Sequence, residues 1–484
     1  MMEVKDVVSA QEWAEQTYGA AQLGHVARTR RAVMIAAAMA AEPAGSVPAQ
    51  QHSQAATKAV YRFCENAHVS YEALMQPHWQ QTRTDASRYP QVLLVQDTTQ
   101  VDYQAHPTTT GLGPIGNGTH HGFLLQSVLA IEPMSQEVVG VLHQEPFLRQ
   151  PAPKQERSQQ RAQRDHEAQV WERAVAAIGS PPAGVQWIHV GDRGSDDFAF
   201  MRACEATRTH FLIRVAQDRL VDEEVQRGQQ PVKPRPHRKR RPEEQQPEPL
   251  KQVVARWPAV GEHVVEVPRE HERQARTAKL RLSWGQVRLH PPQESKDPDR
   301  RPIVVWVLHV WEEQPPEGVE ALEWYLLTSV PTQSESEAWQ RVQWYRQRWT
   351  VEDYHHGLKT GCRIEARQLQ SYEGLRRLLG FLAPLAVRLL QVRWHARQTP
   401  DQLAVQVLPR MLVHLVALKT GGSVEEMTIE QWWKKIAQLG GYLGRKGDGP
   451  PGWKTLWHGW LHLQDLLEGA QLAIQLSLDD YNCG

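Results

Sequence analysis

The sequence predicts an α/β protein whose central region is flanked by helical regions, and three observations indicate this fold class. Short apolar runs rich in valine, leucine and isoleucine alternate with helical stretches between about residues 90 and 215. Mainly strand-like runs follow at residues 253–330, whereas helical periodicity dominates before residue 75 and after Glu335. The length of 484 residues is enough for about three domains, so these regions can be separate domains.

The composition excludes several classes of protein. A chain with 40% apolar residues and 18 tryptophans can build cores, so it is not disordered throughout. The longest apolar run, Ala32 to Ala41, is ten residues, and a membrane span needs about 20, so we expect no membrane partner. Four cysteines lie far apart without a CxxC pair, which argues against a disulfide framework and a zinc site. We therefore expect a cytoplasmic protein.

Residues 1–75 are predicted to form a helical domain. A buried helix is expected around Val33 and Ile35, and a second over Gln54 to Asn66. Small helices with arginine on one face are compatible with DNA binding. On composition alone, a DNA-binding domain and a plain helical cap fit equally well.

The central region is predicted to hold strands that end in acidic residues. The expected strands are Val92–Val95, Phe123–Ile131, Val138–Leu142, Val185–Val190 and Phe211–Ile213, with a helix over Glu167–Ile178. Asp97 follows the first of these strands and Asp192 follows the fourth. A strand end is a rigid platform for a side chain that points into a cleft. Either aspartate alone would more often cap a turn, so the pair needs a third partner.

Residues 215–330 are predicted to be a mainly β insertion. The strand patterns are Val264–Val267, Lys279–Trp284, Ile303–Val310 and Trp324–Thr328. A proline-rich polar stretch at 225–252 precedes them and carries a basic cluster between Lys233 and Arg241. Because the formal net charge of the whole chain is zero, such a cluster indicates either a local contact with a polyanion or a solvated linker.

The third partner lies in a helical segment that starts near Trp344. Tyr345, Arg348, Glu352 and Lys359 are separated by three, four and seven residues. On a helix these four residues fall within about 60° of arc, which makes a polar face. A solvated face with an Arg–Glu pair would explain Arg348 and Glu352, but it gives no reason for the other two to share the line.

The spacing Tyr-x2-Arg-x3-Glu-x6-Lys resembles the signature of the insertion-sequence-4 family of DDE transposases, and within it the transposases of the transposon-five (kanamycin transposon) type. Further similarities run along nearly the whole chain. They include Asp97-Thr98-Thr99, Gly140 to Glu145, Asp192-Arg193, Val387 to Gln391 and Leu439-Gly440-Gly441. One departure is Gly194, because the family usually has glutamate two residues after the second aspartate.

The resemblance implies an RNase H-like catalytic domain over residues 76–395, with the β-rich insertion inside it. By position, Asp97, Asp192 and Glu352 match the three acidic metal ligands of the family. Carboxylates suit Mg²⁺, with Mn²⁺ as a second possibility. Two ions per active site would activate a nucleophile and stabilise the leaving 3′ oxygen. The implied activity is that of a nuclease and DNA strand transferase.

The resemblance also assigns DNA contacts. Arg348 and Lys359 would neutralise phosphates, and Tyr345 would hydrogen-bond one, without reading sequence. Trp324 matches a tryptophan that stacks on a flipped base in relatives, although without the family it would be a core residue. Further candidates in the catalytic domain are Arg214, Arg363 and Arg367. Candidates for contacts to the terminal inverted repeats are Arg28, Arg30, Lys58 and Arg62.

Residues 400–484 take the role of a dimerisation domain in the family, although a plain helical cap remains the alternative. The implied partners are double-stranded DNA, as transposon-end inverted repeats and as target, and a second copy in a synaptic complex. Taken together, the resemblance implies a cut-and-paste transposase that is associated with the nucleoid in a bacterial cytoplasm. One alternative is a non-catalytic, domesticated transposase that acts as a DNA-binding regulator or inhibitor; another is an RNase H-fold nuclease without strand transfer. The intact acidic set argues for the enzyme.

Overall fold

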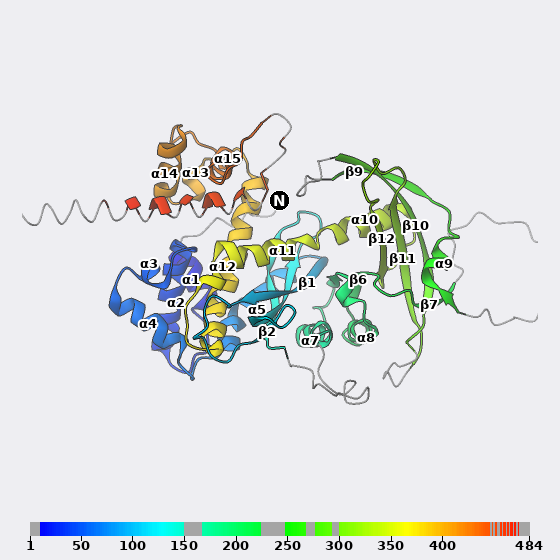
Figure 1. Ribbon diagram of the computed structural model, residues 1–484, viewed down its shortest axis with the longest axis horizontal. Helices are drawn as coiled ribbons and strands as arrows, with labels where there is room; N and C mark the ends of the chain where they lie inside the picture. The colour runs from blue at the N-terminus through cyan, green and yellow to red at the C-terminus, as the bar shows by residue number, and fades with distance from the viewer. Residues whose placement is uncertain are drawn as a thin grey trace, which may run out of the picture.

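The computed structural model describes residues 10–149, 167–223, 247–267, 276–292 and 300–445, and short stretches between 448 and 473. A large sheet occupies the middle, with helices from both ends of the chain gathered at one side and long strands at the other (Figure 1). The predicted basic cluster at 233–241 lies outside the described residues.

The N-terminal helices form a small bundle. They are α1 (Ala10–Tyr18), α2 (Val26–Ala41), α3 (Val47–Gln51) and α4 (Gln54–Cys64). Ser46 and Ser53 cap α3 and α4, since each side chain accepts a hydrogen bond from a backbone amide of the first turn. The Tyr18 hydroxyl donates to the Gly380 carbonyl at 2.8 Å, which fixes the bundle against the long helix α12 (Tyr372–Gln398).

The helix α5 (Tyr71–Ala86) connects this bundle to the sheet. Ser70 caps it, and it packs against β4 (Val138–Phe147) and α12. A Cβ atom at Gly140 of β4 would lie 2.2 Å from the Thr82 hydroxyl, so only glycine allows α5 to approach this closely.

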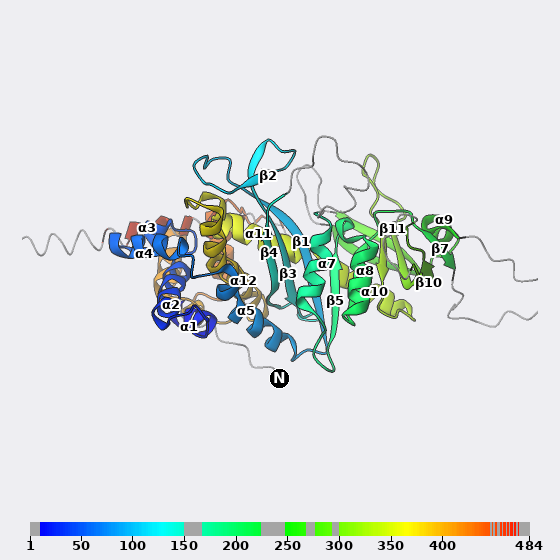
Figure 2. The same cartoon turned by 90° about the horizontal axis from the view of Figure 1, so that it is seen from below.

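Within the described residues, one mixed sheet of 12 strands runs in the order β2-β3-β1-β5-β6-β12-β11-β10-β7-β8, with β4 beside β3 and β9 beside β10. The first group is β1 (Gln91–Asp102), β2 (Gly113–Ile115), β3 (His120–Ile131), β4, β5 (Gln186–Gly191) and β6 (His210–Arg214). Within it, β3 is antiparallel to β1, whereas β5 is parallel to both β1 and β6. The outer halves of β1 and β3 project from the body with the β2 hairpin (Figure 2).

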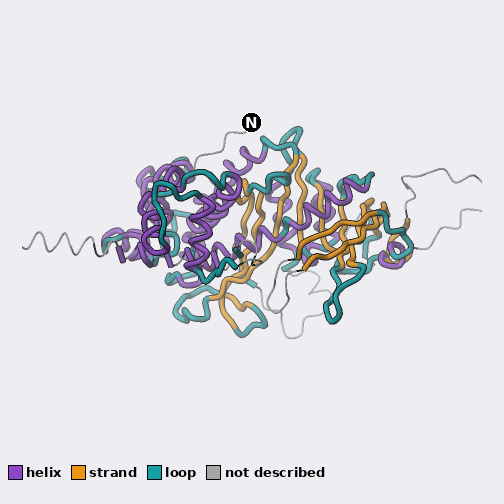
Figure 3. The backbone as a smooth tube through the Cα atoms, turned by 90° about the horizontal axis from the view of Figure 1, so that it is seen from above, coloured by secondary structure: helices purple, strands orange, loops and turns teal. Residues whose placement is uncertain are grey.

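The predicted insertion continues the same sheet. Its strands are β7 (Leu220–Glu223), β8 (Glu248–Pro249), β9 (Gly261–Val267), β10 (Arg276–Leu289), β11 (Ile303–Glu312) and β12 (Glu323–Thr328), with helix α9 (Leu250–Val254) beside β7 and β8. The insertion follows β6 in the chain, and its last strand, β12, returns to pair with β6. The strands, in orange, lie together across the molecule, with many of the helices gathered at one side (Figure 3).

Helices cover both faces of the central sheet. On one side lie α7 (Gln169–Ile178) and α8 (Phe198–Ala206); on the other lie α10 (Glu335–Arg346) and α11 (Trp349–His356) (Figure 1). Alternate residues of β1 enter different cores, because successive side chains of a strand point to opposite faces. Leu93 and Val95 belong to the core on the α10–α12 side, so Asp97 faces that side as well.

The C-terminal helices pack beyond the end of α12. They are α13 (Ala404–Val407), α14 (Arg410–Thr420) and α15 (Ile429–Leu439). Trp432, Trp433 and Trp460 form one aromatic cluster there, whereas Trp453 and Trp457 lie outside the described residues. Among the helices that can be described, none is both long and apolar enough to span a membrane.

Candidate active site

Asp97 and Asp192 come to one place through the parallel pairing of β1 and β5. The ladder joins residues 91–95 to residues 186–190. Asp97 lies just beyond the ladder, and Asp192 follows the end of β5. The Asp192 carboxylate accepts a hydrogen bond from the Gly194 amide at 2.7 Å, which anchors the turn Arg193–Ser195. Neighbouring parallel strands therefore present both acids at the same edge.

The structure corrects the predicted position of Asp97 within its strand. The strand does not end before Asp97 but continues to Asp102, because β3 pairs with its whole outer half. The β-branched residues Thr98, Thr99 and Val101 favour this continuation. Asp97 thus marks the end of the parallel pair rather than the end of the strand.

The carboxyl group of Asp97 has an unusual pKa. Burial, and then the negative charge of Asp192, raise it to about 6, and Glu352 adds a smaller repulsion. Asp97 is therefore close enough to each of the other two acids to be repelled by it. A cation between them would relieve that repulsion.

The third acid, Glu352, stands on α11 and shares one arginine with Asp97. Arg348 Nη2 lies 2.6 Å from Glu352 Oε1, and Arg348 Nη1 lies 3.7 Å from Asp97 Oδ2. The Arg348 side chain is only 8% exposed, whereas that of Glu352 is 41% exposed. The guanidinium therefore occupies the position of a cation between two of the acids.

The donor set fits a hard divalent cation in its chemistry, because it consists of carboxylates with too few positive charges beside them. Among the residues that the structure describes, no three histidine, cysteine or acidic side chains are placed to share one ion. Arg348 bridges Glu352 and Asp97 in this structure.

Tyr345, Trp324 and Arg214 lie around this group of acids. Tyr345 is 6% exposed, and burial raises the pKa of its phenol. Its ring centroid is 6.4 Å from that of the half-buried Trp324 on β12. Arg214, on the adjacent β6, donates to the Glu323 carbonyl at 3.1 Å, and burial lowers its pKa. The sheet and α10 thus bring residues from distant parts of the sequence to one edge of the site.

Lys359 does not share one helical face with the other three members of its motif. The helix α10 ends at Arg346, α11 begins at Trp349, and a π-helical turn follows at Gly357–Gly361. The wider i→i+5 bond from the Cys362 amide to the Gly357 carbonyl changes the rotation that a regular α-helix would give. Lys359 Nζ instead lies 3.5 Å from Glu365 Oε1, in a neighbouring cavity of about 390 Å³ that Asp102 and His120 also line.

Arg363 and Arg367 have different surroundings, although both were expected on one phosphate track. Arg363 is exposed, with a left-handed backbone (φ 51°). Arg367 is 3% exposed and donates to the carbonyls of Cys362 (2.8 Å), Pro43 (2.9 Å) and Gly45. Its side chain is used to join the N-terminal bundle to the catalytic region, so we remove Arg367 from the proposed DNA contacts.

Three protein-family models match the chain, one after another. A transposase DNA-binding model matches residues 10–69, a transposase DDE domain matches 161–387, and a Tn5 transposase dimerisation domain matches 423–479. The domain content is that of a DNA transposase. The mixed α/β sheet fits a DDE transposase core, and such a domain implies dependence on a divalent metal, typically Mg²⁺. The other two matches indicate DNA and a second copy of the chain as partners.

The matched DDE region of the transposase contains Asp192 and Glu352 but begins after Asp97. Asp97 therefore joins the site on structural grounds, through the pairing of β1 with β5 and the mutual repulsion of the acids.

In the DNA-binding region of the transposase, the four predicted contacts lie on α2 and α4. Arg30, Lys58 and Arg62 are exposed. Arg28 is half-buried and donates to the Leu23 carbonyl at 2.9 Å, so part of its hydrogen-bonding capacity is used within the bundle and not for DNA.

Sequence analysis missed a buried ion pair close to the second acid of the transposase. Asp196 and Arg219 lie 3.0 Å apart, with 0% and 6% exposed side chains. Asp196 also accepts from the amides of Ala216 and Gln217, so it holds the turn after β6. The signal was available as the second aspartate of Asp192-Arg193-Gly194-Ser195-Asp196, but its partner is 23 residues away.

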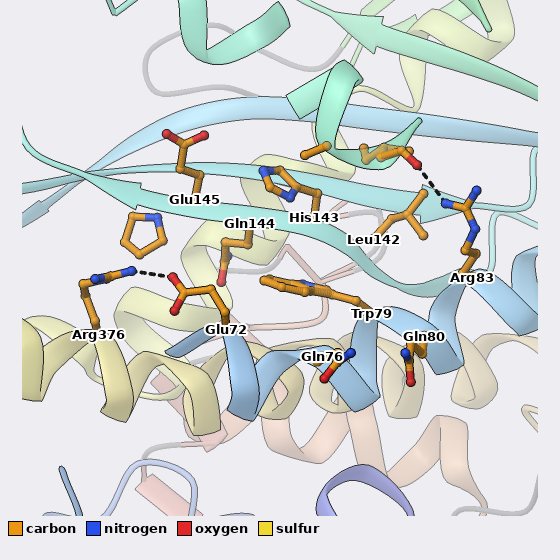
Figure 4. Close-up of a pocket in the computed structure, with 13 residues that line it drawn as sticks. Glu72, Gln76, Trp79, Gln80, Arg83, Leu142, His143, Gln144, Glu145 and Arg376 are labelled. Carbon is orange, nitrogen blue, oxygen red and sulfur yellow. Dashed lines mark hydrogen bonds and ion pairs between the residues drawn. The ribbon is translucent and has the colours of Figure 1, made fainter. Parts of the chain in front are cut away.

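A cavity of about 450 Å³ lies apart from these acids, between α5, β4 and α7 (Figure 4). Trp79 and His143 face each other in it with ring centroids 5.9 Å apart, and the Glu72–Arg376 pair stands at one end. None of the predicted site residues lines this cavity. This cavity is therefore separate from the group of acids at the edge of the sheet.

Proposed function

We propose that the chain is a cut-and-paste DNA transposase of the transposon-five type in the insertion-sequence-4 family. The observation that carries this proposal is the convergence of Asp97, Asp192 and Glu352 in a chain with a matched DDE domain. Strands β4, β3, β1, β5 and β6, with their covering helices, would be its RNase H-like core.

In this proposal Asp97, Asp192 and Glu352 are the catalytic metal ligands. Two bound Mg²⁺ ions, or Mn²⁺ in their place, would activate the attacking oxygen and stabilise the leaving 3′ oxygen. Burial of Asp97 keeps its carboxylate weakly solvated, which strengthens its interaction with a cation. Arg348 would leave Glu352 for a DNA phosphate when an end docks, so that the same motion frees Glu352 and neutralises the backbone.

Each DNA strand would be handled in turn at this site. Hydrolysis of the first strand leaves a 3′ hydroxyl at the transposon end. That hydroxyl attacks the opposite strand to form a hairpin, a second hydrolysis opens the hairpin, and the 3′ end then attacks target DNA. Trp324 supports this order, since its half-buried ring beside Tyr345 can stack on a flipped base.

The remaining contacts position the DNA. Lys359, Arg363, Arg214 and Tyr345 would contact the phosphate backbone around the cleaved end. Residues 1–75 would recognise the terminal inverted repeats through Arg28, Arg30, Lys58 and Arg62. Residues 400–484 would pair two copies in the synaptic complex, and the bacterial nucleoid would supply the target.

The test is a strand-resolved cleavage assay with DNA that carries the inverted repeats flanking this gene. With Mg²⁺ we expect nicked, hairpin, blunt and joined products in sequence, and with Ca²⁺ we expect specific binding alone. Specific binding without products in Mg²⁺ or Mn²⁺ would support the alternative of a DNA-binding regulator and overturn the proposal.

A further inference from the structure

The three acids are fixed in place by different means. Asp97 and Asp192 stand at paired strands, so backbone hydrogen bonds set their separation. Glu352 stands on α11, and a helix makes no backbone ladder with a sheet. Its position over the strands must therefore come from side chains that join α11 to the sheet.

A buried pair of side chains makes this connection one turn after Glu352. His355 Nε2 lies 3.1 Å from Ser127 Oγ on β3. Ser127 is the residue of β3 directly opposite Asp97 in the antiparallel register. His355 is 6% exposed and Ser127 is fully buried. One hydrogen bond thus links the helix of the third acid to the strand residue that faces the first.

Gln144 on β4 extends the connection and fixes the serine. Its amide nitrogen donates to Ser127 Oγ at 2.9 Å and to the Tyr354 hydroxyl at 2.8 Å. Its amide oxygen accepts from the Tyr71 hydroxyl at 3.0 Å. Both amide hydrogens are therefore used, which fixes the orientation of the amide.

The connection carries no charge. Burial, with a smaller contribution from the charge of nearby Lys359, lowers the pKa of His355 to about 3, so the imidazole is neutral at physiological pH. A neutral group can hold α11 without attracting the carboxylate of Glu352 or competing with a cation for it. A lysine or arginine at position 355 would attract the Glu352 carboxylate and compete with a cation for it.

We propose that His355 is a positioning residue which, through Ser127, holds Glu352 at the distance from Asp97 that metal binding requires. This inference rests on the proposed function, because it assumes that the three acids bind a divalent ion. Outer hydrogen bonds of this kind typically change metal affinity by about 10–100-fold when they are removed.

The test compares His355→Leu, His355→Gln and Ser127→Ala with the unaltered full chain. Binding of Mn²⁺ is measured from the free-ion signal in electron paramagnetic resonance, and thermal unfolding is followed in parallel. His189→Leu is the matched control, since His189 is fully buried on β5 and its ring lies 3.2 Å from the side-chain amide of Gln96, next to Asp97. It differs in lying on a strand whose place is already set by the ladder.

We expect His355→Leu and Ser127→Ala each to raise the Kd for Mn²⁺ about 10-fold. The double variant should show no further rise, because both changes remove the same bond. His355→Gln keeps a polar nitrogen within reach of Ser127 and should retain most of the affinity for Mn²⁺. His189→Leu should lower the unfolding temperature but leave the Kd within about twofold of the unaltered value. The Mg²⁺ concentration for half-maximal cleavage should rise with the Mn²⁺ Kd.

An unchanged Mn²⁺ Kd in Ser127→Ala and in folded His355→Leu would overturn the proposal. So would an equal rise in the His189→Leu control, because both results would reduce the network to general packing. Failure of the proposed function has a different signature, in which the unaltered protein binds Mn²⁺ no better than Glu352→Gln does. The two failures are thus distinguishable.

Discussion

Helix α11 carries one exposed, charged residue, Glu352, and two buried, neutral residues, Tyr354 and His355, within a single turn. The Glu352 side chain is 41% exposed and paired with Arg348, whereas Tyr354 and His355 are buried among neutral hydrogen-bond partners. Glu352 is partly exposed, so deep burial does not hold it in place. Its support comes from the buried neutral groups that follow it on the same helix.

The same contrast holds between the charged residues at the proposed active site and the buried residues that hold them in place. Changes on the charged, reachable side should remove chemistry and leave the fold intact. Changes on the buried side should cost stability, because buried hydrogen-bonding groups lose their partners.

The largest expected effect is on the charged side, at Asp97. Asp97→Asn should reduce cleavage at least about 10³-fold, since it removes a metal ligand worth several kcal/mol. Because burial and Asp192 raise the pKa of Asp97 to about 6, its charge is unfavourable in the folded protein at pH 7.5. The variant should therefore be as stable as the parent or more stable, by about 1 kcal/mol. A marked drop in the unfolding temperature of Asp97→Asn would contradict this contrast between residues for chemistry and residues for stability.

The two arginines beyond the π turn sharpen the comparison. Arg367→Ala should lower the free energy of unfolding by about 3 kcal/mol or more, because several buried carbonyls lose a charged donor. Arg363→Ala, at an exposed position, should change stability by no more than about 0.5 kcal/mol but weaken DNA binding. Urea unfolding and gel-shift titrations measure the two quantities. Equal effects of the two substitutions on stability would show that burial does not distinguish a structural arginine from a DNA-contacting one.

Neutral buried histidines predict a loss of stability in acid. Burial lowers the pKa of His78 to about 4, and its ring accepts from the Val141 amide at 3.2 Å. Below pH 6.5 the unfolded chain binds a proton that the folded chain does not, so stability is present above pH 6.5 and is lost as pH falls towards 4. His78→Gln should reduce the loss between pH 7 and pH 5 by up to about 2 kcal/mol. Urea midpoints at the two pH values measure this; identical pH dependence in both proteins would contradict it.

The smallest effect is expected at Lys359, which borders the site without joining the acids. Lys359→Gln should reduce the slope of log binding constant against log salt by about one unit and leave stability unchanged. Lys279→Gln, on the exposed side of β10, is the control and should keep the slope. A Lys359 variant with the slope of the parent would remove this residue from the phosphate contacts.

Local patterns explain how much could be predicted from the sequence. Apolar runs located the strands that carry Asp97 and Asp192, and the Arg348–Glu352 spacing predicted the ion pair that the structure contains. These features depend on residues a few positions apart. The pairing of β1 with β5 joins residues 95 positions apart, and that of β12 with β6 joins residues more than 100 positions apart, so both became visible only in the structure.

The remaining differences have specific physical causes. Arg367 looked like a surface cation, but its partners Pro43 and Gly45 are more than 300 residues away. Lys359 left the predicted polar face because a π turn does not follow the rotation of a regular helix. The network of His355, Ser127 and Gln144 has no local signature, since three elements contribute one residue each.

The central claim is that Glu352 acts in metal-dependent cleavage on the reachable face of α11. Its most direct test is the first nick on a matched transposon end in Mg²⁺, compared between Glu352→Gln and Asp353→Asn. Asp353 is the next acid on the same helix, and its Oδ2 lies 3.4 Å from Arg393 Nη1. We predict that Glu352→Gln binds the end but does not nick it, whereas Asp353→Asn nicks at a rate near that of the parent. Equal nicking by both variants, or loss in both, would contradict the account.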